Sequence, residues 1–276
     1  MIVMDEKARS PGSPPILDAK RHASPPVFRP ENLLREARRQ RRLPELPIPA
    51  VCILDPDGDI VRALRADGRG RPVAGWACYH TEMLTFEAGG MPVGIVGCAV
   101  GAPFAVLVAE QMFASGCDLL LSVTSAGRIA SDLPDSACFV LIERALRDEG
   151  TSYHYLPAGD PFAHADMELI HYVAGAIADA GLPVLRGATW TTDAPFRETE
   201  EAIAWAAAHG VLAVEMEAAA LYAFAQTRGA AVLCFAHVTN RMAQVEGDFE
   251  KGEADGVHDA LGLLATVIMA LRDRRG

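Results

Sequence analysis

Runs of consecutive apolar residues, each ending in a turn of glycine or other small residues, recur along this 276-residue chain. Two of them are MPVGIVGCAVGAP (residues 91–103) and DLLLSVTSAGRI (residues 118–129), and an apolar helical pattern, PFAVLVAEQMFASG, connects them. A strand that is apolar at successive positions is buried on both faces, as in sheets covered by helices on either side. The alternation of such strands with helices predicts a single α/β domain with a mixed, mostly parallel central sheet.

The same patterns give the expected order of elements. Strands are expected at residues 50–54, within 91–103, within 118–129, and at 137–143, 182–192, 211–214 and 230–238. Helices are expected at residues 103–116, 166–181, 198–209, over AVEMEAAALYAFA, and from about 257 to 272. Residues 62–75 are predicted to be an exposed linker. In such sheets the ligand sites lie on the loops beyond the strand ends, which is where the glycine and polar residues gather here.

The N-terminal part of the chain differs in composition from the rest. Residues 1–29 are rich in proline and serine and are predicted to be disordered. RPENLLREARRQRRLP predicts a helix within an N-terminal arm, residues 30–49. The basic stretch at 35–42 is interpreted as the solvated face of that helix, the alternative being a surface that binds anions. Residues 50–276 are predicted to form the domain that carries the site.

Charge narrows the class of partner. The net charge is −11, and the first 49 residues hold ten basic and six acidic side chains against 15 basic and 30 acidic in the remainder. An acidic body of this kind argues against a nucleic-acid partner. We therefore expect a small molecule as the ligand.

The chain carries signs of a cytoplasmic protein without a membrane span. No apolar run reaches the ~18 residues that cross a bilayer, and Asp5 and Glu6 follow Met1–Met4 where a signal peptide would be apolar. The six cysteines are scattered singly, which favours reduced, buried thiols over disulfides or a zinc site.

Common catalytic motifs are missing. The glycines at 94, 97 and 101 do not have the spacing of a dinucleotide-binding turn, and neither a phosphate-binding P-loop nor a G-x-S-x-G serine turn occurs. The eight histidines do not show the spacing of metal ligands. A site without metal or cofactor is expected, with inorganic phosphate as a candidate co-substrate.

Residues 210–229 contain a helix that is apolar almost all the way round, yet two carboxylates, Glu215 and Glu217, stand at its start. Placed on a helix, Glu217 shares its face with Leu221 and Phe224. Acids in a first helical turn contribute only ~0.3–1 kcal/mol through the helix dipole, whereas an unpaired buried carboxylate costs several kcal/mol. A ligand that offers two hydroxyl donors would compensate that cost.

Several motifs in order resemble one family. VEMEAAALY is similar to the signature of the nucleoside phosphorylase superfamily, which includes uridine phosphorylase, hexameric purine nucleoside phosphorylase and methylthioadenosine nucleosidase. GCAVGAPFAVLVAEQM, SVTSAGRI, TTDAPF and HVTNR resemble its glycine turn, its phosphate or water loop, its base-side loop and its strand end over the base. The resemblance covers about residues 50–271. It implies a three-layer α/β/α sandwich, assembled as a homodimer or a homohexamer.

The resemblance also implies roles on the sugar side. Glu217 would accept hydrogen bonds from the ribose 2′- and 3′-hydroxyls, Met216 would pack on the sugar, and Glu215 would support both from the first turn of the helix. His80 lies in a stretch that crosses to the neighbouring subunit in the family, and it would contact the 5′-hydroxyl.

The nucleophile side departs from the phosphorylases of the family. Their G-D-P-x-R turn reads Leu54-Asp55-Pro56-Asp57-Gly58 here, and Ser122 stands at the position of a second arginine. Ser125 and Gly127 of the phosphate or water loop remain, and the loop resembles the G-S-A-G loop of the water-using nucleosidases. Asp59 is predicted as the base that activates water, with Asp55 and Asp57 as neighbours that could act instead. Arg128 and Arg197 could rebuild a phosphate site.

The base side leaves purine and pyrimidine open. The purine enzymes place an aspartate where this chain has Asn240, and an amide cannot act as a general acid; Asn240 is nevertheless predicted to act on the leaving base. Asn240 with Arg241 resembles the pair in uridine phosphorylase. On the base-side loop, Asp193, Phe196 and Arg197 are the candidates for contacts with the base, Phe196 by stacking.

These expectations predict an enzyme that cleaves the N-glycosidic bond of a nucleoside. The missing arginines favour hydrolysis. Phosphorolysis at a rebuilt phosphate site is the alternative, and a family member that binds nucleosides without turning them over is a second one.

Overall fold

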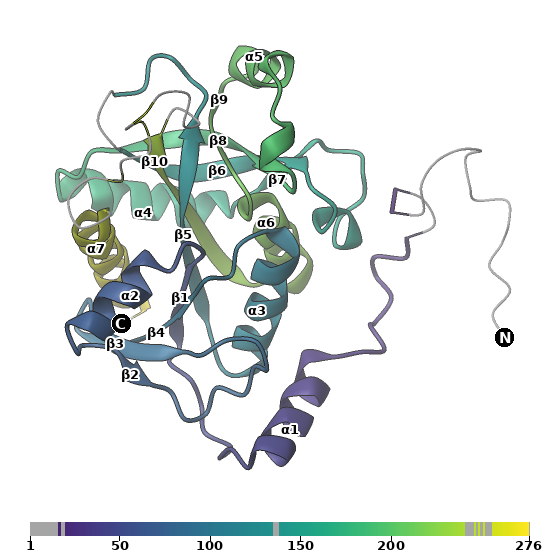
Figure 1. Cartoon of the computed structure of the whole chain (residues 1–276), viewed down its shortest axis with the longest axis vertical. Coiled ribbons are helices and arrows are strands. Elements are labelled where there is room, and N and C mark those ends of the chain that lie inside the picture. The colour runs from purple at the N-terminus through teal and green to yellow at the C-terminus, as the bar shows by residue number, and fades with distance from the viewer. Residues whose placement is uncertain are drawn as a thin grey trace, which may run out of the picture.

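The computed structural model describes residues 16–17, 20–134, 138–240, 246, 248, 251 and 256–275 (Figure 1). The elements follow in the order α1 (Pro30–Arg41), β1 (Val51–Asp55), α2 (Asp59–Ala66), β2 (Arg71–Pro72), β3 (Leu84–Ala88), β4 (Met91–Gly97), α3 (Ala102–Ala114), β5 (Leu119–Arg128), β6 (Cys138–Asp148), η2 (Ser152–His154), β7 (Phe162–His164), α4 (Met167–Asp179), β8 (Val184–Thr192), η3 (Pro195–Arg197), α5 (Glu200–Ala208), β9 (Val211–Glu215), α6 (Ala218–Arg228), β10 (Ala231–Asn240) and α7 (Val257–Arg275).

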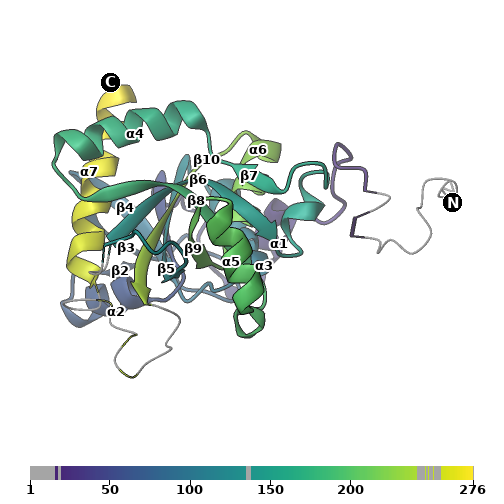
Figure 2. The same ribbon diagram turned by 90° about the horizontal axis from the view of Figure 1, so that it is seen from above.

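Helices cover both faces of one central sheet, so the predicted α/β/α sandwich is confirmed. Helices α3 and α6 contact each other on one face, and α1 packs on the outside of α3. Helix α7 contacts α2 and α4 on the opposite face. Figure 2 shows the strands between these two groups of helices, seen from above.

The sheet is mixed, as expected, and partly closed. Its strand order is β10-β6-β8-β9-β5-β1-β4-β3-β2, and β10 also pairs with β5. Strands β5, β9, β8, β6 and β10 therefore form a ring, while β1, β4, β3 and β2 continue as an open sheet. The long ladders β5–β10 and β6–β8 are parallel, whereas β3–β4, β5–β9 and β6–β10 are antiparallel. This closure brings the ends of β5, β9 and β10 together, and β1 pairs with β5 beside them.

The predicted linker at residues 62–75 is wrong in its first part. Helix α2 occupies Asp59–Ala66 and buries Ile60, Val61 and Leu64 against the sheet. Gly58, just before the helix, has φ +78°, and this left-handed conformation allows the chain to leave β1 and turn directly into α2. The acidic turn after β1, residues 55–59 with Asp55, Asp57 and Asp59, is thus held between a strand and a helix.

The described part of the N-terminal segment contacts the body of the domain. Residues 1–15 and 18–19 of the predicted disordered segment lie outside the described residues, while Lys20 and His22 contact His154 and the Tyr153 carbonyl. Helix α1 buries Leu34 and Ala37, in a cluster that Ala114 of α3 also joins. The arm therefore lies on the body of the domain. No helix in the described parts of the chain is long and apolar enough to cross a membrane.

Helix α6 is the centre of the core. Its residues from Ala218 to Phe224 are all buried. The hydroxyl of Tyr222 donates to the Ile142 carbonyl of β6 at 2.6 Å and accepts from the Cys234 amide of β10 at 3.1 Å. A β-bulge follows Ile142 in the β6–β8 ladder, so the tyrosine satisfies backbone groups where the sheet is irregular.

We expect Tyr222→Phe to lower the free energy of unfolding by about 1–3 kcal/mol, because two buried backbone groups lose their partner. Urea denaturation measures the effect. Tyr172→Phe is the matched control: its hydroxyl also donates to a carbonyl, that of Ala270, but it is exposed, and the change should stay within about 0.5 kcal/mol. Equal effects of the two substitutions would contradict this role of Tyr222.

Candidate functional site

The two glutamates of VEMEAAALY lie at a junction of strand and helix where several other elements meet. Strand β9 ends at Glu215, and α6 begins at Ala218 (Figure 1). The end of β5, the end of β10 and the N-terminus of α3 are adjacent to this junction through the contacts described below. The expectation that both acids stand inside the first turn of the helix is therefore wrong.

Glu215 is a fully bonded buried carboxylate. One oxygen, Oε2, accepts from the backbone amides of Glu217 and Ala218, both at 2.7 Å, and the other accepts from the hydroxyls of Thr189 at 3.1 Å and Thr191 at 2.5 Å. It caps α6 from the preceding strand, because its side chain satisfies amides that a helix leaves free at its start. Burial raises its pKa, and these hydrogen bonds oppose the rise.

Glu217 is the cap residue of α6 and is only 1% exposed. Its Oε1 accepts from the Gly101 amide at 2.7 Å, and its Oε2 accepts from the Thr124 hydroxyl at 2.9 Å. Gly101 precedes α3 with φ +90°, so the amide that approaches the carboxylate stands at the N-terminus of that helix. Burial, followed by the charge of Glu215, raises the pKa of Glu217 to about 8.

The acidic turn after β1 reaches the phosphate or water loop through Asp57. Its Oδ2 accepts from the Ser125 amide at 2.8 Å and from the Ser125 hydroxyl at 2.6 Å. Asp55 instead accepts from the amides of Gly58 and Val61, and burial, with the nearby Asp57 and Asp59 charges, raises its pKa to about 6. Asp55 therefore holds the turn together.

Asp59, the predicted base, does not contact Ser125 through any hydrogen bond that the structure describes. It is the first residue of α2, where it pairs with Arg62 one turn later and with Lys251 at 2.5 Å. Two cations thus hold its carboxylate toward the helix and the segment before α7. Of the three acids in the turn, Asp57 is the one whose carboxylate bonds Ser125.

Two residues that the sequence interpretation missed complete this corner. His237 on β10 lies opposite Ser125 in the parallel ladder, and its ring stacks on Phe139 with centroids 4.4 Å apart. Burial, together with the charge of Lys251, lowers its pKa. His237 and Lys251 line a small cavity with the acidic turn and Ser125. In the sequence, His237 is marked only by its place in HVTN, at the end of a predicted strand. Lys251 is marked only by the scarcity of lysine, which occurs at 7, 20 and 251.

The remaining loop residues are placed as follows. Gly127 pairs with Val214 of β9 and lies opposite Asn240 of β10. The amide of Asn240 is buried and donates to the Thr239 hydroxyl at 3.1 Å. Arg128 donates to the carbonyls of Leu133 and Pro134, so its guanidinium folds over the following turn rather than toward Ser125.

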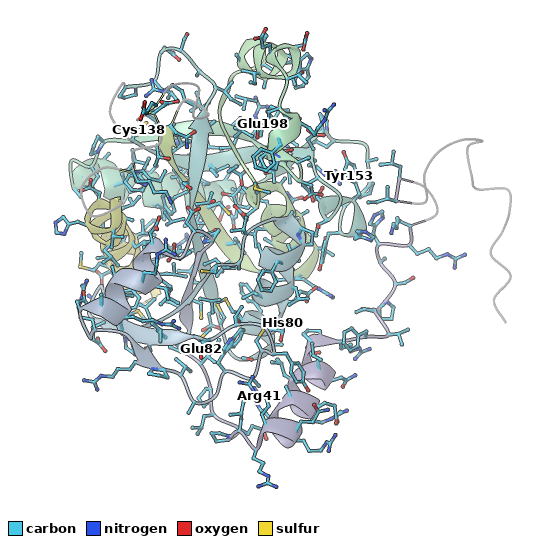
Figure 3. The ribbon with its side chains drawn as sticks, in the orientation of Figure 1. Arg41, His80, Glu82, Cys138, Tyr153 and Glu198 are labelled. Carbon is cyan, nitrogen blue, oxygen red and sulfur yellow. The ribbon has the colours of Figure 1, made fainter. Side chains whose placement is uncertain are left out.

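The base-side and 5′-side candidates lie near the surface. Asp193 accepts from the Gly150 amide at 2.8 Å, and Phe196 is 100% exposed, next to the exposed Arg197 in η3. Arg241 lies outside the described residues. Met216 is half-buried between the two glutamates. His80 is exposed beside α3, edge-on to Phe104 with centroids 6.4 Å apart (Figure 3).

The raised pKa of Glu217 makes stability depend on pH. Between about pH 4.5 and pH 8 the folded chain keeps a proton on Glu217 that the unfolded chain has lost, so this residue makes stability fall as the pH rises through that range. We expect Glu217→Gln to flatten the fall, measured by thermal unfolding between pH 5 and pH 9. Glu82→Gln, at an exposed glutamate, is the control. An unchanged slope in Glu217→Gln would contradict the assignment.

Comparison with solved structures shows the same fold. Uridine phosphorylase from Vibrio fischeri superposes with a TM-score of 0.68, covering 83% of this chain and 95% of that chain at 18% identity. Purine nucleoside phosphorylase from Toxoplasma gondii, in complex with immucillin-H, superposes with a TM-score of 0.70, covering 85% and 95% at 16% identity. At these identities the likeness concerns the fold alone.

Sequence comparison identifies the family. A DeoD-type purine nucleoside phosphorylase from Brevibacillus brevis is 31% identical over 157 residues, 55% of this chain and 66% of that enzyme. A guanosine phosphorylase from Halorubrum lacusprofundi is 27% identical over 190 residues, 66% of this chain and 78% of that enzyme. The family model of the phosphorylase superfamily matches residues 50–269. The chain therefore belongs to the phosphorylase superfamily, as VEMEAAALY and the other motifs predict.

Proposed function

We propose that this protein cleaves the N-glycosidic bond of a nucleoside by phosphorolysis. The family membership and the relatives named as purine nucleoside and guanosine phosphorylases support the reaction class. They also support phosphorolysis better than the hydrolysis that the missing arginines favour, because each of these relatives is named a phosphorylase. Purine and pyrimidine nucleosides are both candidate substrates.

Glu217 supplies the sugar side of the proposed reaction. It is buried, and its two oxygens face neutral donors, the Gly101 amide and the Thr124 hydroxyl, rather than a cation. Ribose hydroxyls can join or replace such donors. Once Glu217 is ionised, its carboxylate in this dry site stabilises the positive charge that develops on the sugar as the C1′–N bond breaks, so it binds the transition state better than the ground state.

The observation that carries the nucleophile side is the set of donors around Ser125. The amide and the hydroxyl of Ser125 both donate to one carboxylate oxygen, and the Lys251 ammonium lies 3.5 Å from the same atom. Two neutral donors and one cation converging on a single oxygen are suited to an oxygen of phosphate. This corner therefore offers an anion site without the arginines of the family motifs.

One contact favours hydrolysis as a second candidate. The oxygen that now occupies those donors belongs to Asp57, a carboxylate that could accept a proton from an attacking water. In that case Asp57, rather than Asp59, would be the base. The two reactions give different sugar products, so they are separable by experiment.

The test is to incubate the protein with purine and pyrimidine nucleosides in buffer with and without inorganic phosphate, and to identify the products by chromatography. We expect free base and ribose 1-phosphate, formed only with phosphate. Ribose formed without phosphate would establish hydrolysis instead. Binding of a nucleoside without any product would contradict the proposal that the protein cleaves the N-glycosidic bond. Arsenate should replace phosphate under the first outcome and have no effect under the second.

Glu217→Ala should reduce turnover at least about a hundredfold, because the carboxylate is required where charge develops. Both oxygens of Glu215 already accept hydrogen bonds from the protein. Glu215→Gln should therefore act mainly on stability, and it should lower the unfolding temperature because α6 loses its cap. Comparing kcat for the two variants, each at a temperature where it is folded, checks the division of roles. A larger loss of kcat in Glu215→Gln than in Glu217→Ala would show that the roles are reversed.

Assembly as a homodimer or a homohexamer is part of the proposal. The exposed position of His80 beside α3 fits a residue that a second subunit could reach. Light scattering on the purified protein measures the state.

A further inference from the structure

A carboxylate of the chain itself occupies the site where the proposed reaction needs an external anion. Asp57 Oδ2 has three partners: the Ser125 amide at 2.8 Å, the Ser125 hydroxyl at 2.6 Å and the Lys251 ammonium at 3.5 Å. We call these three donors the anion slot. An oxygen of phosphate and an oxygen of a carboxylate make the same demands on such donors, so they compete for them.

Lys251 is the cation of this slot. It comes from the segment before α7, and its side chain is only 13% exposed. It lies between two acids, 2.5 Å from Asp59 and 3.5 Å from Asp57. The chain has three lysines among its 25 basic residues, and this is the one that the structure places in the cavity. A lysine acts as a compact point charge with freely rotating donors, so it can change partner without a fixed fork geometry.

Because both are negatively charged, phosphate and the Asp57 carboxylate cannot occupy the anion slot together. Asp55, Asp57 and Asp59 all border the cavity, and a phosphate dianion placed beside three carboxylates would be repelled. Asp59 has a second partner in Arg62, which leaves Lys251 able to serve another anion. Asp55 is tied to backbone amides and has a pKa of about 6. Asp57 is therefore the acid that has to leave when phosphate enters.

Of the three acids in the turn, Asp57 has the side chain most open to solvent. It is 29% exposed, whereas its backbone carbonyl accepts from the Arg62 guanidinium at 3.0 Å. Arg62 thus fixes the backbone of the turn independently of the carboxylate. Rotation of the side chain toward solvent would release both donors of Ser125 and Lys251 together, without unfolding the turn.

We propose that Asp57 is an internal competitor for the anion slot and that Lys251 is the shared cation, so that this pair sets the affinity of the protein for inorganic phosphate. The inference rests on the proposed function only in the identity of the anion. It assigns the role of the missing arginines to a residue distant in sequence, and it makes the acidic turn a determinant of which nucleophile enters.

The experiment is titration calorimetry of the full-length protein with inorganic phosphate alone, without nucleoside. Asp57→Asn removes the competing charge and should bind phosphate about tenfold more tightly. Lys251→Met should bind phosphate at least about tenfold more weakly, and Lys251→Arg should stay within about threefold of the unchanged protein. Asp179→Asn and Lys20→Met make the same charge changes at positions outside the slot, and they should leave the affinity unchanged.

Phosphate affinity that is equal in the unchanged protein, Asp57→Asn and Lys251→Met would overturn the inference, provided that thermal unfolding shows all three to be folded. Affinity that is weaker in Lys251→Arg than in Lys251→Met would also overturn it, because the role assigned to residue 251 is that of a cation. Nucleoside cleavage without phosphate, with no phosphate binding even in Asp57→Asn, refutes the slot but leaves bond cleavage standing. Phosphate binding that follows the expected order, with no nucleoside cleaved, supports the slot and refutes the proposed function.

Discussion

The carboxylate of Glu215 is the interaction on which the arrangement of the site depends. It joins three elements at once, because it accepts from two threonine hydroxyls of β8 and two backbone amides at the start of α6 while it ends β9. These four hydrogen bonds compensate the burial of its charge. They also fix the direction in which the chain leaves the sheet, and this direction positions Glu217 two residues later.

The two acids therefore have different roles at the same junction. Glu215 has every oxygen engaged by the protein, so it is a structural group. Glu217 is equally buried but has only two donors; burial first and then the charge of Glu215 raise its pKa to about 8. A buried acid held by neutral donors can exchange them for hydroxyls of a ligand at little cost. Because Glu215 caps α6, the Glu217 side chain is not needed for the cap, and its carboxyl group can bind a ligand.

The sequence predicted the layered fold and the burial of two acids beside α6, because both depend on local patterns. Strands such as DLLLSV are apolar at each position, and VEMEAAALY keeps two acids beside a small-residue helix. Helix α2 was missed because a segment of eight residues gives too little periodicity to detect. The boundary at Glu215 was misplaced because alanine-rich sequence continues the helical pattern backward, whereas the side-chain cap decides where the helix begins.

Contacts between distant segments explain why the nucleophile side could not be predicted in the same way. Lys251 and Asp59 are 192 residues apart, and Asp57 and Ser125 are 68 apart, so sequence spacing carries no signal for either pair. In the turn after β1, Asp57 and Asp59 are only partly buried, and their side chains bond Ser125 and Lys251 rather than the apolar core. Glu217, by contrast, is fixed by the core itself. The departures of this sequence from the family motifs, Leu54, Gly58 and Ser122, are themselves buried, so the nucleophile side diverges together with the packing around it, while the two glutamates at the junction before α6 are kept.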